Sequence, residues 1–146
     1  MNYHNKAFLL VSLQFIGIFL MLLTTKYKSF SIVASILLIA SIALVSWALL
    51  AMKKSRFRFS PVPADDAVLI IRGPYKYIRH PMYSAIILGT IGLLLIDFTW
   101  YRFGIGIFLT MILILKLQWE EKMLLNAFKS YRHYMKNTKR IIPFFY

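Results

Sequence analysis

The chain alternates long apolar segments with short segments rich in basic and aromatic residues. Residues 7–23 are apolar except for Ser12, Gln14 and Gly17, and residues 30–52 contain no charged side chain. A helix of about 20 apolar residues crosses a hydrocarbon core of about 30 Å. Both segments are therefore predicted to form membrane-spanning helices.

Two further apolar segments, residues 82–96 and 103–115, are shorter and are separated only by residues 97–102. We predict that they form a helical hairpin that barely crosses the membrane, extended by flanking aromatic residues or shielded by the first two helices. A helical spacing of apolar residues continues to about Tyr134 and predicts an amphipathic helix at the membrane surface. The predicted fold is an all-α integral membrane protein with four transmembrane helices, a cytoplasmic loop and a C-terminal amphipathic helix.

The composition excludes a water-soluble enzyme. Of the 146 residues, 60% are hydrophobic and 16% charged, against about 45–50% and about 25% in soluble domains. The net charge of +13 is typical of nucleic-acid-binding proteins, but the basic residues alternate with apolar segments instead of forming one stripe, so no nucleic-acid partner is expected. With no cysteine, three histidines and five acidic residues, no metal site is predicted.

The distribution of basic residues predicts the orientation. Residues 53–79 contain seven Lys and Arg and the tail after Gln118 contains six, whereas the two loops at the opposite side contain only Lys26, Lys28 and Arg102. Because short cytoplasmic loops accumulate Lys and Arg, both termini, the central loop and the tail are predicted to face the cytoplasm. We expect a bacterial or archaeal inner (plasma) membrane.

Groups able to do chemistry are concentrated in residues 60–83 and 116–143. In the first segment, Arg79, His80 and Tyr83 surround the start of the third apolar segment, where Pro81 suits the first turn of a helix. Such a helix N-terminus favours an anionic group such as a carboxylate. The alternative is an interface anchor, because Tyr and Arg are common at headgroup level.

The second segment contains the two glutamates of the chain, Glu120 and Glu121. Lys116 precedes Glu120 by four residues and therefore lies on the same helical face. A Lys–Glu pair of this kind is usually a solvated contact. However, two acids at the C-terminal end of a helix are disfavoured by the helix dipole unless the helix continues through them, and this favours a functional role.

Taken together, these segments resemble the isoprenylcysteine carboxyl methyltransferase family and its phospholipid methyltransferase relatives. The similarity covers roughly residues 57–146 and depends on the order and spacing of several motifs. They are Gly73-Pro74-Tyr75-Lys76-Tyr77-Ile78-Arg79-His80-Pro81-Met82-Tyr83, then Glu120-Glu121-Lys122-Met123-Leu124, the aromatic residues Phe128, Tyr131 and Tyr134, and the closing Arg140-Ile141-Ile142-Pro143.

The resemblance implies a methyltransferase that uses S-adenosylmethionine. Lys116 stands where eukaryotic members have an Arg that faces the methyl acceptor. Lysine keeps the positive charge but cannot donate the two parallel hydrogen bonds that a guanidinium donates to a carboxylate. We predict Lys116, Arg79 and Glu120 as catalytic residues. The cofactor-binding residues implied by the resemblance are Ala67, Val68, Leu69, Ile70, Tyr75, His80, Pro81, Met82, Tyr83 and Glu120.

The predicted activity is methylation of a lipid-borne or hydrophobic acceptor, such as a prenylated one, at the cytoplasmic membrane face, most like isoprenylcysteine carboxyl O-methylation. Residues 1–146 would form one domain, with residues 1–56 as scaffold helices and residues 57–146 as the catalytic region. Three alternatives stay open: N-methylation of a phospholipid amine with Glu120, Glu121 or His80 as base, an NADPH-dependent membrane reductase with a similar Arg-His-x-x-Tyr turn, and a small four-helix transporter. The oligomeric state also stays open.

Overall fold

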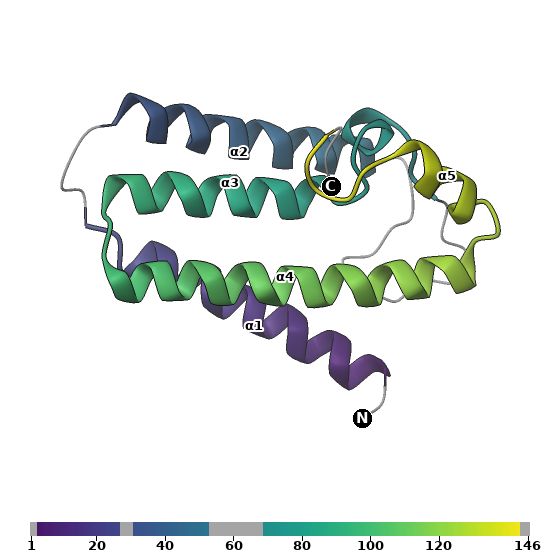
Figure 1. The fold of residues 1–146 in the computed structure, drawn as a ribbon, viewed down its shortest axis with the longest axis horizontal. Coiled ribbons are helices and arrows are strands. Elements are labelled where there is room, and N and C mark those ends of the chain that lie inside the picture. Colours follow the sequence, from purple (N-terminus) through teal and green to yellow (C-terminus); the bar gives the residue numbers. More distant parts are fainter. Residues whose placement is uncertain (1–2, 27–30, 53–68, 144–146) are drawn as a thin grey trace.

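The computed structural model describes residues 3–26, 31–52 and 69–143, and these residues form an all-α protein (Figure 1). Within them, the β-structure is limited to one isolated parallel bridge, between Ile78 and Lys139. The all-α prediction is confirmed. The helices are α1 (Tyr3–Leu23), α2 (Ile32–Met52), the 3₁₀ helix η1 (Gly73–Lys76), α3 (Pro81–Ile96), α4 (Trp100–Ala127) and α5 (Tyr131–Asn137).

Three of these helices, α1, α2 and α4, are long and apolar enough to cross a membrane. The prediction of four spans is corrected in two ways. Helix α4 has 28 residues, because it begins before the fourth apolar segment and continues through the acidic pair to Ala127. Helix α3 has 16 residues, which at 1.5 Å per residue is about 24 Å and shorter than a hydrocarbon core of about 30 Å.

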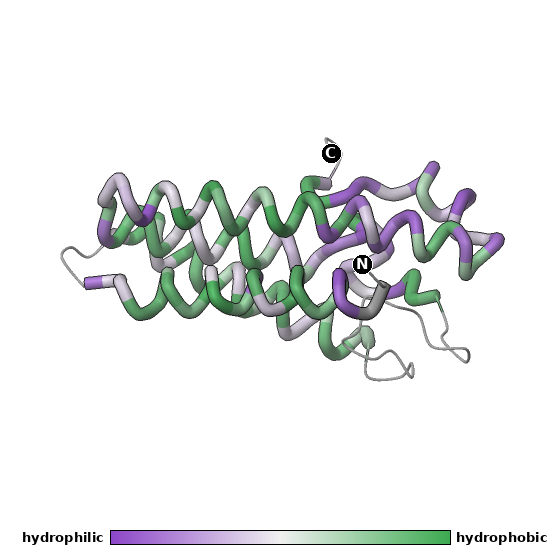
Figure 2. The backbone as a smooth tube through the Cα atoms, turned by 90° about the horizontal axis from the view of Figure 1, so that it is seen from below, coloured by the Kyte–Doolittle hydropathy of each residue, from purple (hydrophilic) through white to green (hydrophobic). Residues whose placement is uncertain are grey.

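The helices run antiparallel in chain order, so α1 and α3 start, and α2 and α4 end, at the same end of the molecule (Figure 1). Helix α3 packs between α2 and α4, and α1 packs on α4. Gly92 allows the close approach of α2, since a Cβ added there would lie 3.2 Å from the Ala34 carbonyl oxygen. Ser41 also donates a hydrogen bond of 2.8 Å to the Ala85 carbonyl. Figure 2 shows apolar residues along most of the length of the helices and polar residues gathered at the end of the molecule where α5 lies.

The α3–α4 hairpin is linked to the residues that directly follow α1 by a polar cluster around buried Asp97 and Arg102. Arg102 was expected in the connecting loop, but it lies in the first turn of α4 and is fully buried. Its guanidinium lies 3.4 Å from the Asp97 carboxylate and donates a 2.6 Å hydrogen bond to the Thr25 hydroxyl. Asp97 in turn accepts a 3.1 Å hydrogen bond from the Lys26 backbone N–H. The sequence analysis missed this cluster because its members come from two segments far apart in the chain.

The amphipathic helix predicted to continue to about Tyr134 is interrupted. Helix α4 ends at Ala127, and Phe128 adopts an extended conformation with φ −127° and ψ 113°. The chain restarts as the seven-residue helix α5. This change of direction places Tyr131, which is almost fully buried, back against the end of the bundle.

Candidate functional site

The start of α3 and the C-terminal tail are paired through their backbones. The Arg79 N–H donates to the Lys139 carbonyl over 2.7 Å, the His80 N–H donates to the Arg140 carbonyl over 3.0 Å, and the Ser84 hydroxyl donates to the Ile141 carbonyl over 2.6 Å. The tail is therefore held along the first turn of α3, where the sequence places its motif residues.

The turn before α3 depends on Gly73. Its φ of +61° lies in the left-handed region that favours glycine, and a Cβ at this position would lie 2.9 Å from Ala51 Cβ in α2. Pro74 follows in the first turn of η1, and Arg72 donates a 3.0 Å hydrogen bond to the Ala51 carbonyl. The Gly-Pro-Tyr motif therefore fixes η1 against the end of α2 and directs Tyr75 toward the site.

Glu121 anchors the tail rather than facing an open space. Its carboxylate is nearly fully buried and accepts hydrogen bonds from Arg79 Nε at 2.7 Å and from Arg140 Nε at 3.1 Å. The Arg79 guanidinium also donates to the carbonyls of Met135 and Thr138. Arg79 thus joins α3, α4 and the tail, and its charge is largely satisfied within the protein.

His80 lies between the two glutamates. Its Nδ1 is 3.7 Å from Glu120 Oε2 and its Nε2 is 3.5 Å from Glu121 Oε1. The ring is buried and stacks on Tyr83, with ring centroids 5.3 Å apart. Pro81 starts α3 directly after it. The imidazole therefore connects the anchoring carboxylate to the one that faces the cavity.

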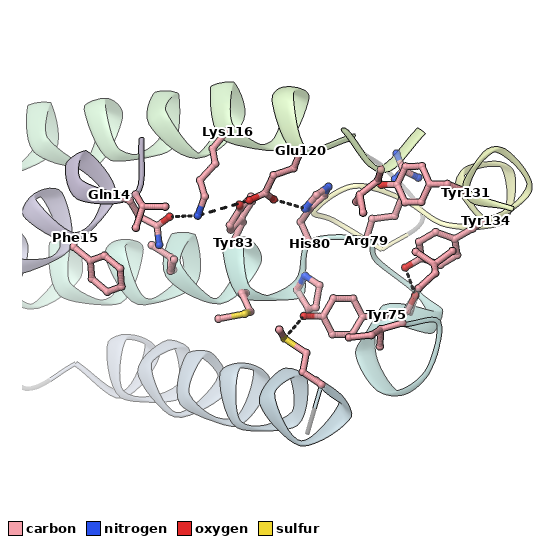
Figure 3. A pocket seen from close by; sticks show the side chains of 18 residues that line it. Gln14, Phe15, Tyr75, Arg79, His80, Tyr83, Lys116, Glu120, Tyr131 and Tyr134 are labelled. Carbon is pink, nitrogen blue, oxygen red and sulfur yellow. Dashed lines mark hydrogen bonds and ion pairs between the residues drawn. The ribbon is translucent and has the colours of Figure 1, made fainter. Parts of the chain in front are cut away.

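Glu120, Lys116 and Gln14 form a line along one wall (Figure 3). Lys116 Nζ donates a 2.8 Å hydrogen bond to Gln14 Oε1, lies 3.8 Å from Glu120 Oε1 and stands 5.1 Å from the centroid of the Tyr83 ring. The predicted Lys116–Glu120 proximity is confirmed. The partner from α1 was not predicted.

Three tyrosines form the opposite part of the site (Figure 3). The Tyr75 hydroxyl donates to Met52 Sδ over 3.1 Å, and the Tyr134 hydroxyl donates to the Tyr75 carbonyl over 2.6 Å. Burial, with the nearby negative charge of Glu120, raises the pKa of Tyr75 to about 12. Burial likewise raises the pKa values of Tyr131 and Tyr134. All three phenols are therefore neutral at ordinary pH.

These residues enclose a cavity of about 220 Å³. Ala67 and Val68 lie outside the described residues. The other predicted site residues all line the cavity: Leu69, Ile70, Tyr75, Arg79, His80, Pro81, Met82, Tyr83, Lys116 and Glu120. The cavity walls that were not predicted include Val11, Gln14 and Phe15 of α1, Met52 of α2, and Ile86, Leu124, Tyr131 and Tyr134.

The missed residues differ in how visible they were in the sequence. Tyr131 and Tyr134 belong to the aromatic motif of the tail, but the motif alone did not place them at the site. Gln14 was a visible signal, since it is an amide inside an apolar segment, where an unsatisfied polar group is costly. Val11 and Phe15 are ordinary apolar residues of a membrane helix, and no sequence pattern distinguishes them.

The side chains that line the cavity fit S-adenosylmethionine. Glu120 offers a partly shielded carboxylate to a cationic group, with its side chain 17% exposed. Leu69, Ile70 and Tyr75 offer apolar and aromatic walls to a flat base. Among the described residues, no three His, Asp or Glu side chains are grouped to hold a metal ion.

Comparison with known proteins identifies the family. The model of the phospholipid methyltransferase family matches residues 29–131. This range includes α2, α3, α4, the Arg-His-Pro motif and the acidic pair, but not α1. No curated protein sequence is significantly similar to the chain.

The family match begins earlier and ends earlier than the resemblance inferred from motifs, yet it supports the same enzyme class. It favours neither the reductase nor the transporter. Because the match covers more than half of the chain and includes most of the residues that line the cavity, the protein belongs to the phospholipid methyltransferase family, whose membrane enzymes take the methyl group from S-adenosylmethionine.

Proposed function

We propose that the protein transfers a methyl group from S-adenosylmethionine to the carboxylate of a lipid-borne or hydrophobic acceptor at the cytoplasmic face of the membrane. The observation that carries this proposal is the environment of Lys116. Lys116 is 7% exposed, and its ammonium donates a hydrogen bond to the neutral oxygen of Gln14 and lies 3.8 Å from Glu120 Oε1. A buried cation in an apolar site favours an anionic ligand.

The cofactor supplies a methyl group activated by a sulfonium. Glu120 supports binding of that cation, and Leu69, Ile70, Tyr75, His80, Pro81, Met82 and Tyr83 shape the rest of its pocket. Ala67 and Val68 keep the role implied by the resemblance. Arg79 acts as a positioning residue, because its hydrogen bonds go to Glu121 and to the tail.

Methyl transfer from a sulfonium to a carboxylate neutralises both charges. A site that excludes water therefore destabilises the separated charges relative to the transition state, and alignment supplies much of the rest. A carboxylate acceptor needs no general base. Lys116 orients the carboxylate while the acceptor tail lies among the apolar walls of α1 and α3.

A second candidate is N-methylation of a phospholipid amine, which the name of the matched family favours. An ammonium acceptor must first lose a proton, and Glu120 is the carboxylate available for this in the cavity. Lys116 opposes this alternative, because its positive charge disfavours a second cation nearby.

Purified full-length protein with methyl-labelled S-adenosylmethionine tests the proposal. The acceptors offered are N-acetyl-S-farnesylcysteine, oleate and phosphatidylethanolamine vesicles. A methyl ester releases labelled methanol in alkali, whereas an N-methyl group does not. Base-labile label on either carboxylate supports O-methylation. Label that stays on the phospholipid after alkali establishes the amine alternative, and no transfer to any acceptor, including a total lipid extract, contradicts the proposal.

A further inference from the structure

Helix α1 contributes to the site although it lies outside the family match. The match begins at residue 29, yet Val11, Gln14 and Phe15 of α1 line the cavity. Gln14 is 7% exposed and meets Lys116 across 102 residues of sequence. This contact therefore joins a residue outside the matched region to a residue within it.

The Gln14 contact satisfies the Lys116 ammonium without neutralising it. An ammonium has three donors, and in the described part of the chain one of them is taken by Gln14 Oε1 at 2.8 Å. Glu120 Oε1 lies at 3.8 Å, beyond hydrogen-bond length, and the Tyr83 ring contributes only its face. The remaining donors are thus available to a ligand in the cavity, with Glu120 as a neighbouring ion-pair partner.

Gln14 also competes with Glu120 for the Lys116 ammonium, which forms a long ion pair of 3.8 Å with that carboxylate. A lysine side chain is flexible, and at i, i+4 spacing it can close further on the glutamate to form a hydrogen-bonded pair. Figure 3 shows the ammonium between the amide on one side and the carboxylate on the other. Without the amide, closure onto Glu120 would remove the cation from the acceptor side and the carboxylate from the cofactor side.

We propose that Gln14 is a positioning residue that determines acceptor specificity: it holds the Lys116 ammonium toward the carboxylate end of a long-chain amphiphile. This inference rests on the proposed function and makes it more specific, since it assigns the selection of an anionic acceptor to α1. Val11 lies about one helical turn before Gln14, and Phe15 follows Gln14 directly. Their apolar side chains contact the hydrocarbon chain of the same acceptor.

The test compares two probes that differ in their end group, oleate and oleyl alcohol. Their affinities are measured by calorimetry on full-length protein saturated with S-adenosylhomocysteine, in one detergent at fixed concentration. The wild type should bind oleate about tenfold more tightly than the alcohol. Gln14→Met, which has a similar volume and no acceptor oxygen, should bring the two affinities within about threefold of each other.

Two further variants separate positioning from packing. Gln14→Glu keeps the oxygen but neutralises Lys116, and it should weaken oleate binding at least as much as Gln14→Met while leaving the alcohol unchanged. Gln118→Met makes the same chemical change at an exposed position of α4 outside the cavity, and it should behave as the wild type. If Gln14→Met does not fold, Gln14→Asn, which shortens the amide, should lower the oleate preference to an intermediate value.

Failure of this inference is distinguishable from failure of the proposed function. Equal affinity of the wild type for both probes, or an unchanged preference in the folded Gln14 variants, overturns the role of Gln14 while nucleotide binding leaves the methyltransferase in place. If S-adenosylhomocysteine itself does not bind, the proposed function fails. The affinities for oleate and oleyl alcohol are then compared without nucleotide. A preference of the wild type for oleate that is lost in Gln14→Met still supports the role of Gln14, and its absence overturns that role.

Discussion

Arg79 and Glu121 are joined by a hydrogen-bonded ion pair of 2.7 Å, in which both side chains are at most 7% exposed. The same carboxylate also accepts from Arg140 of the tail. The acidic pair of α4 therefore divides into two roles: Glu121 faces the protein and closes the tail over α3, whereas Glu120 faces the cavity.

Removing Glu121 should destabilise the protein more than removing any exposed charge nearby. Glu121→Ala leaves Arg79 buried without its carboxylate, and breaking a buried pair in this way costs about 3–5 kcal/mol. Denaturant unfolding in detergent measures this loss. Lys122→Ala, at an exposed neighbouring position, should change stability by less than about 0.5 kcal/mol. Equal stability of the two variants would show that the tail does not depend on this pair.

Glu120→Gln should leave the fold intact and alter cofactor selectivity. S-adenosylmethionine has a sulfonium, whereas S-adenosylhomocysteine has a neutral thioether, so a carboxylate beside the sulfur favours the former. We expect Glu120→Gln to weaken S-adenosylmethionine binding by about tenfold and S-adenosylhomocysteine binding by less. Calorimetry with both ligands measures the difference. An equal loss for both would place Glu120 away from the sulfur, near another part of the cofactor.

Lys116→Met should slow methyl transfer while keeping cofactor affinity within about threefold of the wild type. The reason is that its ammonium is held on the Gln14 side of Glu120. Steady-state kinetics with an acceptor identified as above give kcat/KM, and calorimetry gives the cofactor Kd. A parallel loss of both quantities would contradict an acceptor-side role for Lys116.

Much of this architecture was predictable from local sequence, because apolar segments specify helices and short motifs specify turns. Residues of the Arg-His-Pro segment and of the acidic pair were expected in one site, and the structure brings them together. The sequence did not predict which residues from distant segments contact one another. Gln14 is visible in the sequence as an amide inside an apolar segment, but its partner Lys116 is not. Likewise, no local pattern indicates that Arg102 is buried against Asp97.

The length of the elements near the site was also not predictable from apolar runs. Helix α4 continues through charged residues because Lys116 and Glu121 are satisfied by partners from α1 and from the tail. The interruption at Phe128 follows from Tyr131, whose burial against the bundle requires a new helix direction. Both features depend on tertiary contacts that a local pattern does not contain.

The raised pKa of Tyr75 predicts a dependence of stability on alkaline pH. Its pKa is 10.0 for an unperturbed tyrosine and about 12 in the folded protein, so the folded state retains the proton that the unfolded state releases. The stabilisation by this group is complete below pH 10 and is lost as the pH rises toward about 12. The stability of the wild type relative to Tyr75→Phe should therefore fall across this interval. Denaturant unfolding of both proteins measures it, and a constant difference from pH 9 to about pH 12 would show that the phenol is not shielded.

The buried cluster at the other end of the molecule leads to a prediction about folding rather than activity. Arg102→Met removes the guanidinium that pairs with the buried Asp97 carboxylate and donates to Thr25, and it should cost about 3–5 kcal/mol because breaking a buried ion pair leaves a charge in the protein interior. Adding Asp97→Leu should restore part of this stability, since the buried negative charge is then removed as well. A double-mutant cycle by denaturant unfolding measures the coupling between the two residues. Additive losses would mean that they stabilise the hairpin independently. Cofactor affinity should stay unchanged in every variant that folds, because the cluster lies where α3 ends and α4 begins, whereas the cavity is lined by the start of α3 and the later part of α4. Figure 1 shows these helix ends at opposite ends of the molecule.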